Sequence, residues 1–248
     1  MILFGLWFRA GLFLTQKGEA LTENLFRGTI EEKGESMDPL EFFEARKSIR
    51  SYTRTAPSRE DLEKMVKAAC LAPTGKNRQN WHIVYTENRE FMTKAAALIL
   101  EKSERLTVQL KDERQKESLQ RITPFTVFFR DAPALIFFFH GEYSVTGAEA
   151  LRQTGAQDES KALLRAAPGV QGAAAAMENF LLCAAMLGYG TCWMTAPLFA
   201  ARELETLIGL DMEGFRLMAL SPLGRPDPEL KTLRPVRKPA GEMITVIP

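Results

Sequence analysis

The sequence has few of the residues that build disulfides and metal sites. Its 248 residues include three cysteines and two histidines, and no two cysteines form a Cys-x-x-Cys pair. An odd number of widely spaced cysteines disfavours a disulfide framework and a cysteine-built zinc or iron–sulfur site. His82 and His140 leave little for a histidine-ligated metal. We therefore expect no metal site in this chain.

An excess of charge of one sign is also missing. Lys and Arg number 32 against 31 for Asp and Glu, which gives a formal net charge of +1. This balance provides no global attraction to nucleic acid or to an anionic membrane, so neither is an expected partner. Apolar residues make up 46% of the chain. A chain of this length and composition can bury a sizeable core without disulfides or structural metals.

No apolar run is long enough to cross a membrane. Residues 1–14, MILFGLWFRAGLFL, fall short of the about 20 apolar residues that a membrane helix needs. They also lack the basic region that precedes the apolar part of a signal peptide. Asp38 and Pro39 are then typical of an N-cap and a first helical residue. Two interpretations stay open: residues 1–37 are a flexible appendage before a domain at 38–248, or they are an interfacial anchor.

From residue 38 onward the pattern alternates between helix and strand. Ser58 and Asp61 resemble a capping box before a helix, and the continuous apolar run 134–139 predicts a strand buried on both faces. Residues 141–169 show little periodicity and are interpreted as a loop or irregular lid with a short helix around 159–166. The pattern indicates one α+β domain. Further helices are expected over 89–121, 173–187 and 201–208, and further strands over 82–86, 191–195, 215–221 and 243–247.

The sharpest local cluster is the pentapeptide RKSIR at residues 46–50. If the chain is extended there, Arg46, Ser48 and Arg50 share one face because alternate side chains of a strand point the same way. Two guanidiniums beside a hydroxyl are a donor set that suits a phosphate. Taken alone, the pentapeptide is better explained as a charged surface cluster.

Two further segments are rich in hydrogen-bonding groups or glycine. Residues 72–81, APTGKNRQNW, offer donors and acceptors beside an apolar Trp wall, or else form a turn with a buried Trp. Residues 187–193, LGYGTCW, permit a sharp turn that exposes backbone N–H groups. This segment is not a dinucleotide-binding G-x-G-x-x-G motif, because it opens no helix. Cys192 is interpreted as a small packed residue and not as a nucleophile.

A second basic cluster, RPVRK at residues 234–238, lies near the C-terminus. In this order, the four segments over residues 38–248 resemble the nitroreductase family of FMN-dependent oxidoreductases. The resemblance implies a three-layer α/β/α domain with a central, mostly antiparallel sheet. It also implies that the apolar helix 173–187 is a buried helix at the core of a homodimer. Asn80 departs from the pattern, because many relatives carry Pro before the Trp.

The resemblance also implies a set of cofactor-binding residues. Arg46, Ser48 and Arg50 would hold the FMN phosphate and ribityl chain, with Lys47 contributing mainly through its backbone. A second subunit would bring a loop to the flavin, and the backbone of 191–193 would lie near its reactive N5. The implied set comprises Arg46, Lys47, Ser48, Arg50, Pro73, Thr74, Asn77, Gln79, Thr191, Cys192, Trp193, Arg237 and Lys238.

The function implied is a cytoplasmic oxidoreductase that needs no protein nucleophile. NADH or NADPH would reduce bound FMN, and a nitroaromatic, quinone or related small acceptor would be reduced in turn by a ping-pong mechanism. Four alternatives stay open. They are a member specialised for dehalogenation, a member that fragments its own flavin, a flavin-binding regulator with incidental redox activity, and a phosphate-binding module without flavin.

Overall fold

The computed structural model describes residues 39–210, 213–229 and 236–247. The chain divides into two units, Met1–Phe42 and Phe43–Pro248. The expected appendage 1–37, the proposed N-cap Asp38 and the basic residue Arg234 lie outside the described residues. All of the strands described belong to the second unit, and they form one sheet.

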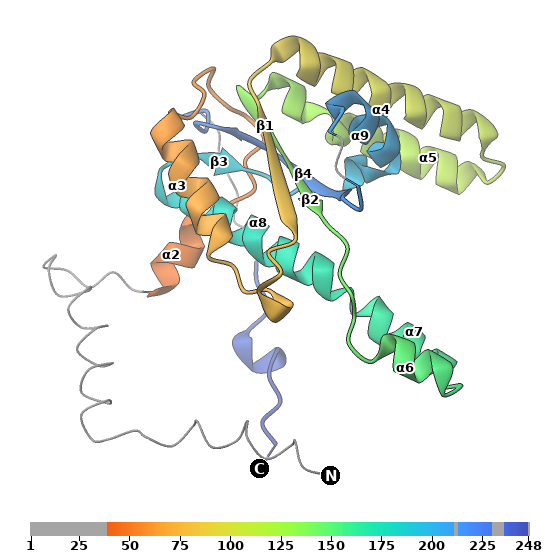
Figure 1. The fold of residues 1–248 in the computed structure, drawn as a ribbon. Helices are drawn as coiled ribbons and strands as arrows, with labels where there is room; N and C mark the ends of the chain where they lie inside the picture. The colour runs from red at the N-terminus through yellow and green to blue at the C-terminus, as the bar shows by residue number, and fades with distance from the viewer. Residues whose placement is uncertain (1–38, 211–212, 230–235, 248) are drawn as a thin grey trace, which may run out of the picture. The chain divides into compact units, whose positions relative to one another are not determined.

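A four-stranded antiparallel sheet stands at the centre of the second unit (Figure 1). Its order is β1-β2-β4-β3, with each neighbouring pair antiparallel. Phe138 lies opposite Ile83 on one side and Ala219 on the other, and a bulge follows it against β4. The sheet confirms the α+β class with antiparallel strands. The strands are β1 (Trp81–Thr86), β2 (Ala134–His140), β3 (Gly190–Thr191) and β4 (Arg216–Gly224).

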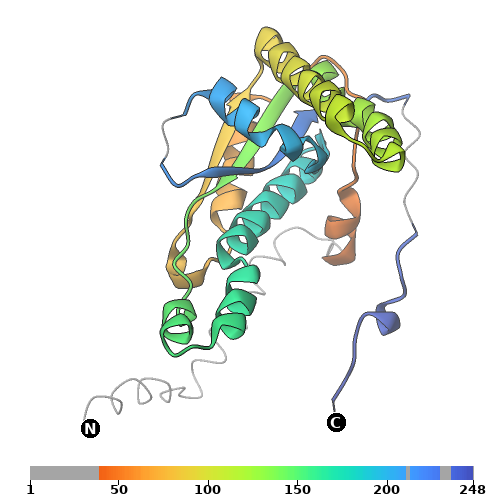
Figure 2. The same cartoon turned by 90° about the vertical axis from the view of Figure 1, so that its right-hand side faces the viewer.

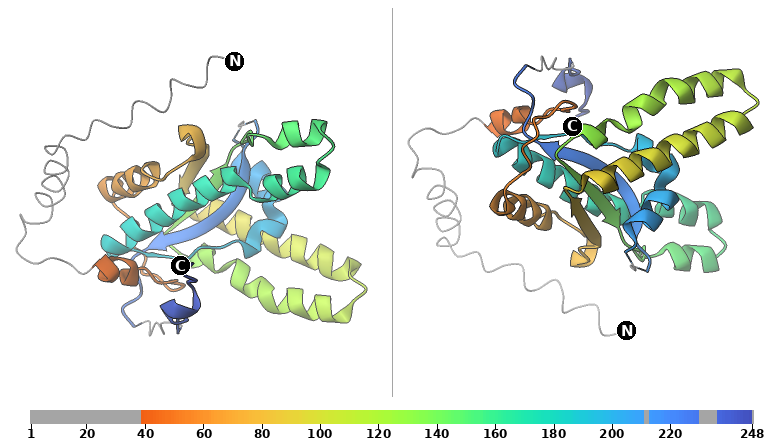
Figure 3. Two further views of the ribbon diagram at one scale, coloured as in Figure 1. Left: turned by 90° about the horizontal axis from the view of Figure 1, so that it is seen from below. Right: turned by 90° about the horizontal axis from the view of Figure 1, so that it is seen from above.

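The central strand β2 is buried on both faces, as its apolar run predicts. Phe138 belongs to the core cluster shared with helices α3 and α8. Its neighbour Phe137 points to the opposite face and packs in the cluster shared with α4 and α9. Helices therefore cover both faces of the sheet (Figure 3), which confirms the expected three layers.

On the first face, α3 (Arg59–Cys70) packs against α8 (Pro168–Met186). The capping box is confirmed, because Ser58 Oγ accepts a hydrogen bond of 3.1 Å from the backbone N–H of Asp61. Helix α8 begins at 168, five residues earlier than expected, since Pro168 takes the first helical position where its missing N–H costs nothing.

On the second face, the helix expected over 89–121 is two helices, α4 (Arg89–Gln109) and α5 (Glu113–Ile122). The break occurs because Asp112 acts as an N-cap: its Oδ1 accepts a hydrogen bond of 2.9 Å from the N–H of Arg114. Helix α9 (Ala201–Ile208) matches its expected range and is joined to α4 by an ion pair of 2.7 Å between Lys102 and Glu203.

Segment 141–169 contains two helices, α6 (Ala148–Gln153) and α7 (Gln157–Arg165), which lie beside the start of α8 (Figure 2). The short helix expected around 159–166 is confirmed as α7, whereas α6 was not expected. Two strand expectations are wrong. The strand expected over 191–195 is only the two residues of β3. Residues 243–247 form no strand, because strand propensity without a neighbouring edge does not make a sheet. The short helix α2 (Pro39–Ala45) precedes the RKSIR segment, and short 3₁₀ helices cover 75–77, 123–126, 128–131, 196–200 and 240–242.

Candidate active site

The RKSIR segment runs alongside β3. Ser48 forms a parallel bridge with Thr191, and the N–H of Ile49 donates a hydrogen bond of 2.8 Å to the Thr191 carbonyl. Ile49 is buried against Gly190, where a Cβ would lie 2.7 Å from the Ile49 Cβ. Only glycine at 190 permits this close approach. The segment is therefore fixed to the end of the sheet by its own chain.

Alternate side chains of this segment face opposite ways. The guanidiniums of Arg46 and Arg50 and the hydroxyl of Ser48 all lower the pKa of the Cys192 thiol. Lys47 and Ile49 instead line a separate cavity of about 290 Å³ beside Tyr189. Two guanidiniums and a hydroxyl therefore lie on the side of the segment that faces Cys192. This is a donor set that suits a phosphate.

Arg46 is held by a carboxylate on helix α8. Its Nε lies 3.3 Å from Oε1 of Glu178, and the two side chains are 21% and 43% exposed. The contact of this ion pair is made at Nε, the guanidinium nitrogen nearest the backbone. The sequence does not predict this contact, because nothing in the local pattern around Glu178 points to Arg46.

Cys192 is a packed thiol. Its side chain is buried, and its backbone N–H donates a hydrogen bond of 3.1 Å to Ser221 Oγ. Burial raises the pKa of the thiol, although Arg50, Ser48 and Arg46 act in the opposite direction. A raised pKa leaves little thiolate near neutral pH, which agrees with Cys192 being a packing residue and not a nucleophile.

An open cavity of about 490 Å³ lies beside the same residues. Its walls are mostly apolar, with one guanidinium among them, which suits a planar, partly apolar ligand with an anionic group. The sequence analysis missed the segment between α5 and β2 as a wall of this site; the cluster of large apolar residues around Pro124 was the available signal. The cavity is lined by Arg50, Ile122, Phe125, Phe128 and residues 192–196.

The loop Pro73–Gln79 is exposed except for a half-buried Thr74. Three of its non-glycine residues adopt positive φ values: Lys76 at 56°, Asn77 at 50° and Gln79 at 46°. Such residues are uncommon in this region, and several together indicate a backbone held under strain. A hydrogen bond of 3.1 Å from the Gln79 N–H to Thr74 Oγ1 closes the loop.

The loop and the RKSIR segment contact different parts of α8. A Cβ on Gly172 would lie 3.0 Å from Thr74, whereas Arg46 pairs with Glu178. These two helix positions are about 9 Å apart along the axis. Arg237 and Lys238 are exposed in segment 236–247.

Asn80, which replaces the proline of many relatives, is a structural residue. It is 9% exposed, and its Nδ2 donates a hydrogen bond of 2.9 Å to the carbonyl of Gly141. The backbone N–H of Gly141 donates 2.7 Å back to the Asn80 carbonyl. These bonds extend the β1–β2 pairing beyond Trp81, so the side chain fastens the sheet edge and does not face the cavity beside Cys192.

The protein-family comparison matches the Nitroreductase family over residues 43–225, which include Arg46, the 73–79 loop and Cys192. The chain belongs to the nitroreductase family. The crystal structure of a BluB-like flavoprotein from Clostridium difficile 630 is 36% identical, with a TM-score of 0.77 over 85% of this chain and 99% of that one. This family member therefore shares nearly the whole length of a solved flavoprotein.

Other relatives of this nitroreductase-family chain are more distant. An iodotyrosine deiodinase of Thermotoga neapolitana is 27% identical over 73% of this chain and 85% of its own length. A nitroreductase from Bacteroides fragilis with bound FMN has a TM-score of 0.61 at 19% identity, over 85% of this chain and all of that one, and it shows the fold alone. The chain spans 32% and 64% of two archaeal relatives provisionally named NADH dehydrogenase/NAD(P)H nitroreductase.

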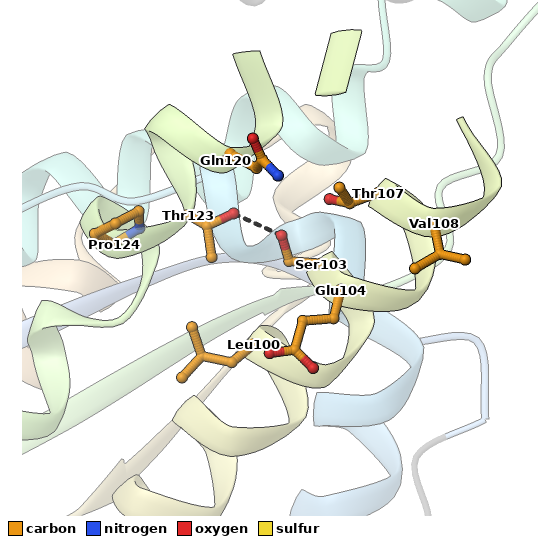
Figure 4. A pocket seen from close by; sticks show the side chains of 8 residues that line it. All are labelled: Leu100, Ser103, Glu104, Thr107, Val108, Gln120, Thr123 and Pro124. Atoms are coloured by element: carbon orange, nitrogen blue, oxygen red, sulfur yellow. Dashed lines mark hydrogen bonds between the residues drawn. The ribbon is translucent and has the colours of Figure 1, made fainter. Parts of the chain in front are cut away.

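The family member has a third cavity, of about 450 Å³, between α4 and α5 (Figure 4). Ser103 and Thr123 share a hydrogen bond of 2.6 Å at its floor. Thr123 and Pro124 line this cavity, while Ile122 and Phe125 line the one beside Cys192. None of the sequence-predicted site residues lines it.

Among the described residues, none of the helices has the length and apolarity that crossing a bilayer requires.

Proposed function

We propose that the protein is an FMN-dependent oxidoreductase. The observation that carries the proposal is the open, mostly apolar cavity lined by Arg50 and Cys192, with Arg46 and Ser48 at alternate positions of the same segment, which bridges to β3. Charged and hydroxyl donors fit the phosphate of FMN, and the cavity fits a flat ring system. The solved flavoprotein relative, 36% identical, supports the same cofactor class.

Each part of the site has its own role in this proposal. Arg46, Ser48 and Arg50 would hold the phosphate and the sugar chain, and the backbone of 191–193 would lie along the ring near its reactive N5. Lys47 contributes through its backbone, since its side chain lines a different cavity. Arg237 and Lys238 close on the phosphate from the C-terminal side. FMN, when bound, would supply the redox chemistry that links the two substrates. Electrons from NADH or NADPH would in this way reach a nitroaromatic, quinone or similar small acceptor in a ping-pong sequence.

The complete site is proposed to need two chains, with Pro73, Thr74, Asn77 and Gln79 of a second copy reaching the cofactor. The exposure and strain of the loop support this arrangement, as does its separation from Arg46 along α8. Strained backbone concentrates where function requires a particular geometry. The apolar helix α8 is proposed as the core of the homodimer. We place the enzyme in the cytoplasm, where reduced nicotinamide donors are available.

The direct test is spectroscopic. The purified protein, supplemented with FMN and passed through a desalting column, is expected to retain a flavin absorbance. Anaerobic NADH or NADPH is expected to bleach that absorbance, and subsequent addition of a quinone or nitroaromatic to restore it. Protein that retains no flavin contradicts the cofactor assignment. Protein that stays yellow with both donors contradicts the oxidoreductase and supports a flavin-binding regulator.

Reductive dehalogenation is a second candidate reaction. The match to an iodotyrosine deiodinase, which covers 85% of that protein, is the observation that favours it. The aromatic wall of Phe125 and Phe128 gives the cavity a surface on which an aromatic substrate can stack. The reduced enzyme is to be offered iodotyrosine, a halophenol and a nitroaromatic in parallel. Faster release of iodide than loss of the nitro compound favours the deiodinase reaction, and the opposite ranking favours nitroreduction.

A further inference from the structure

The ion pair between Arg46 and Glu178 joins the RKSIR segment to helix α8. Oε1 of Glu178 lies 3.3 Å from Nε of Arg46, the nitrogen nearest the backbone of the arginine. A guanidinium held at Nε keeps its two terminal nitrogens for another ligand. No hydrogen bond is formed between these two described side chains, so the pair is not a closed fork-to-fork pair with two parallel hydrogen bonds, and the guanidinium keeps donors for a phosphate.

The two partners differ in how firmly their backbones are held. Glu178 sits between the buried residues Met177 and Phe180 on a helix of 19 residues. The adjacent Asn179 fastens that helix to α3 through a hydrogen bond of 3.2 Å from its Nδ2 to the carbonyl of Ala68. Arg46 instead follows the end of α2, two residues before the RKSIR segment meets β3. Glu178 is thus the member of the pair whose backbone lies in the longer and more deeply packed helix.

We propose that Glu178 is a positioning residue that orients the Arg46 guanidinium toward the phosphate group of the cofactor. This inference rests on the proposed FMN function. Arginine has a long, flexible side chain, so fixing its planar group in advance reduces the ordering that ligand binding requires. The negative charge of Glu178 repels a phosphate, and the benefit of orienting the Arg46 guanidinium outweighs this repulsion.

The test compares two ligands that differ only in the phosphate. Dissociation constants for FMN and riboflavin are measured by quenching of flavin fluorescence, with FMN release followed by dilution. Glu178→Ala is expected to raise the dissociation constant of FMN roughly two- to fivefold, the effect of losing one partly exposed ion pair, and to leave that of riboflavin unchanged. Glu178→Gln keeps the shape of the side chain but removes its charge, and it is expected to weaken FMN binding to a similar degree.

Glu90→Ala is the matched control, because it removes a carboxylate that pairs at 2.7 Å with Lys94 on the distant helix α4. It is expected to change neither constant. The inference is overturned if Glu178→Ala binds FMN as tightly as the wild type or more tightly, or if FMN and riboflavin weaken together. If Glu178→Ala does not fold, Glu178→Gln still decides, because unchanged FMN affinity in this variant contradicts orientation by the carboxylate charge. Wild-type protein that binds neither flavin instead refutes the proposed function itself.

Discussion

Two segments proposed to hold one cofactor are built in opposite ways. Residues 46–50 are fastened to β3 by a backbone hydrogen bond, and Ile49 is buried against Gly190. Residues 73–79 are mostly exposed and contain three non-glycine residues at positive φ. Residues 46–50 are held in place by contacts within the same chain, whereas the strained loop 73–79 is exposed to solvent. We infer that the fold of one chain positions residues 46–50, and that residues 73–79 complete the site of a second chain.

The largest expected effect concerns the segment that the fold supports. Arg46→Ala is expected to weaken FMN binding by roughly 1.5–3 kcal/mol, because it removes a charge-assisted contact with the phosphate. Equilibrium dialysis or fluorescence titration measures the change, and riboflavin binding is expected to change far less. Arg59→Ala removes an equally paired arginine from the exposed surface of α3 and serves as the control. Unchanged FMN affinity in Arg46→Ala would show that the phosphate lies elsewhere.

The attachment of the same segment is tested at Gly190. Gly190→Ala places a methyl group 2.7 Å from Ile49, and overpacking of this kind costs about 1–3 kcal/mol of unfolding free energy. Urea denaturation measures the loss, and FMN affinity is expected to fall as the segment shifts. Gly241→Ala is the control, since a Cβ there meets nothing within 4 Å. Equal stability of the two variants would mean that residues 46–50 are not held in place by β3.

The exposed loop is tested by mixing subunits. Arg46→Ala and Gln79→Ala each alter one side of the proposed shared site, so homodimers of either variant are expected to bind FMN weakly. Mixed dimers contain one site in which both residues are intact, and these sites are expected to bind FMN as the wild type does. Co-expression with two different affinity tags isolates the mixed dimer. Binding midway between the two parents, without a tight class of sites, would place both residues in one chain.

The smallest expected effect is a change in loop strain. Lys76→Gly is expected to raise the unfolding free energy by less than about 1 kcal/mol, because relief of the positive φ is partly offset by the entropy of glycine. Thermal denaturation checks the sign. Lys111→Gly, in the link between α4 and α5, introduces the same glycine without a positive φ and is expected to lower stability. A loss in both variants would argue against stored strain.

Much of the fold follows from local patterns. The capping box at Ser58, the buried run of β2 and the range of α9 were all readable because the causes lie within a few adjacent residues. The break at Asp112 was missed because the charged, helix-favouring residues on both sides conceal one N-cap. The strand predicted over 243–247 is wrong because a local pattern does not show whether a partner is present. Its β-branched residues have no described strand to pair with.

The candidate site was predictable only in part. The spacing of residues 46–50 was enough to place their alternate side chains on one face. Glu178 and Phe125 were not predictable, because their relation to Arg46 and Cys192 arises from the packing of distant segments. The assignments of Pro73, Thr74, Asn77, Gln79, Arg237 and Lys238 to the cofactor stay predictions. A pattern within one chain cannot report contacts that a second chain makes.

The bridge between Ser48 and Thr191 also bears on how the protein is made. Ile49 has its backbone partner in Thr191, far along the chain, so this contact cannot form while only the first half has left the ribosome. Contacts of such large sequence separation form late and slow the folding of a domain. In newly synthesised chains, the backbone N–H of Ile49 therefore lacks its native acceptor until β3, which follows α8, has emerged. Interruption of synthesis before residue 191 is expected to leave a chain that chaperones retain.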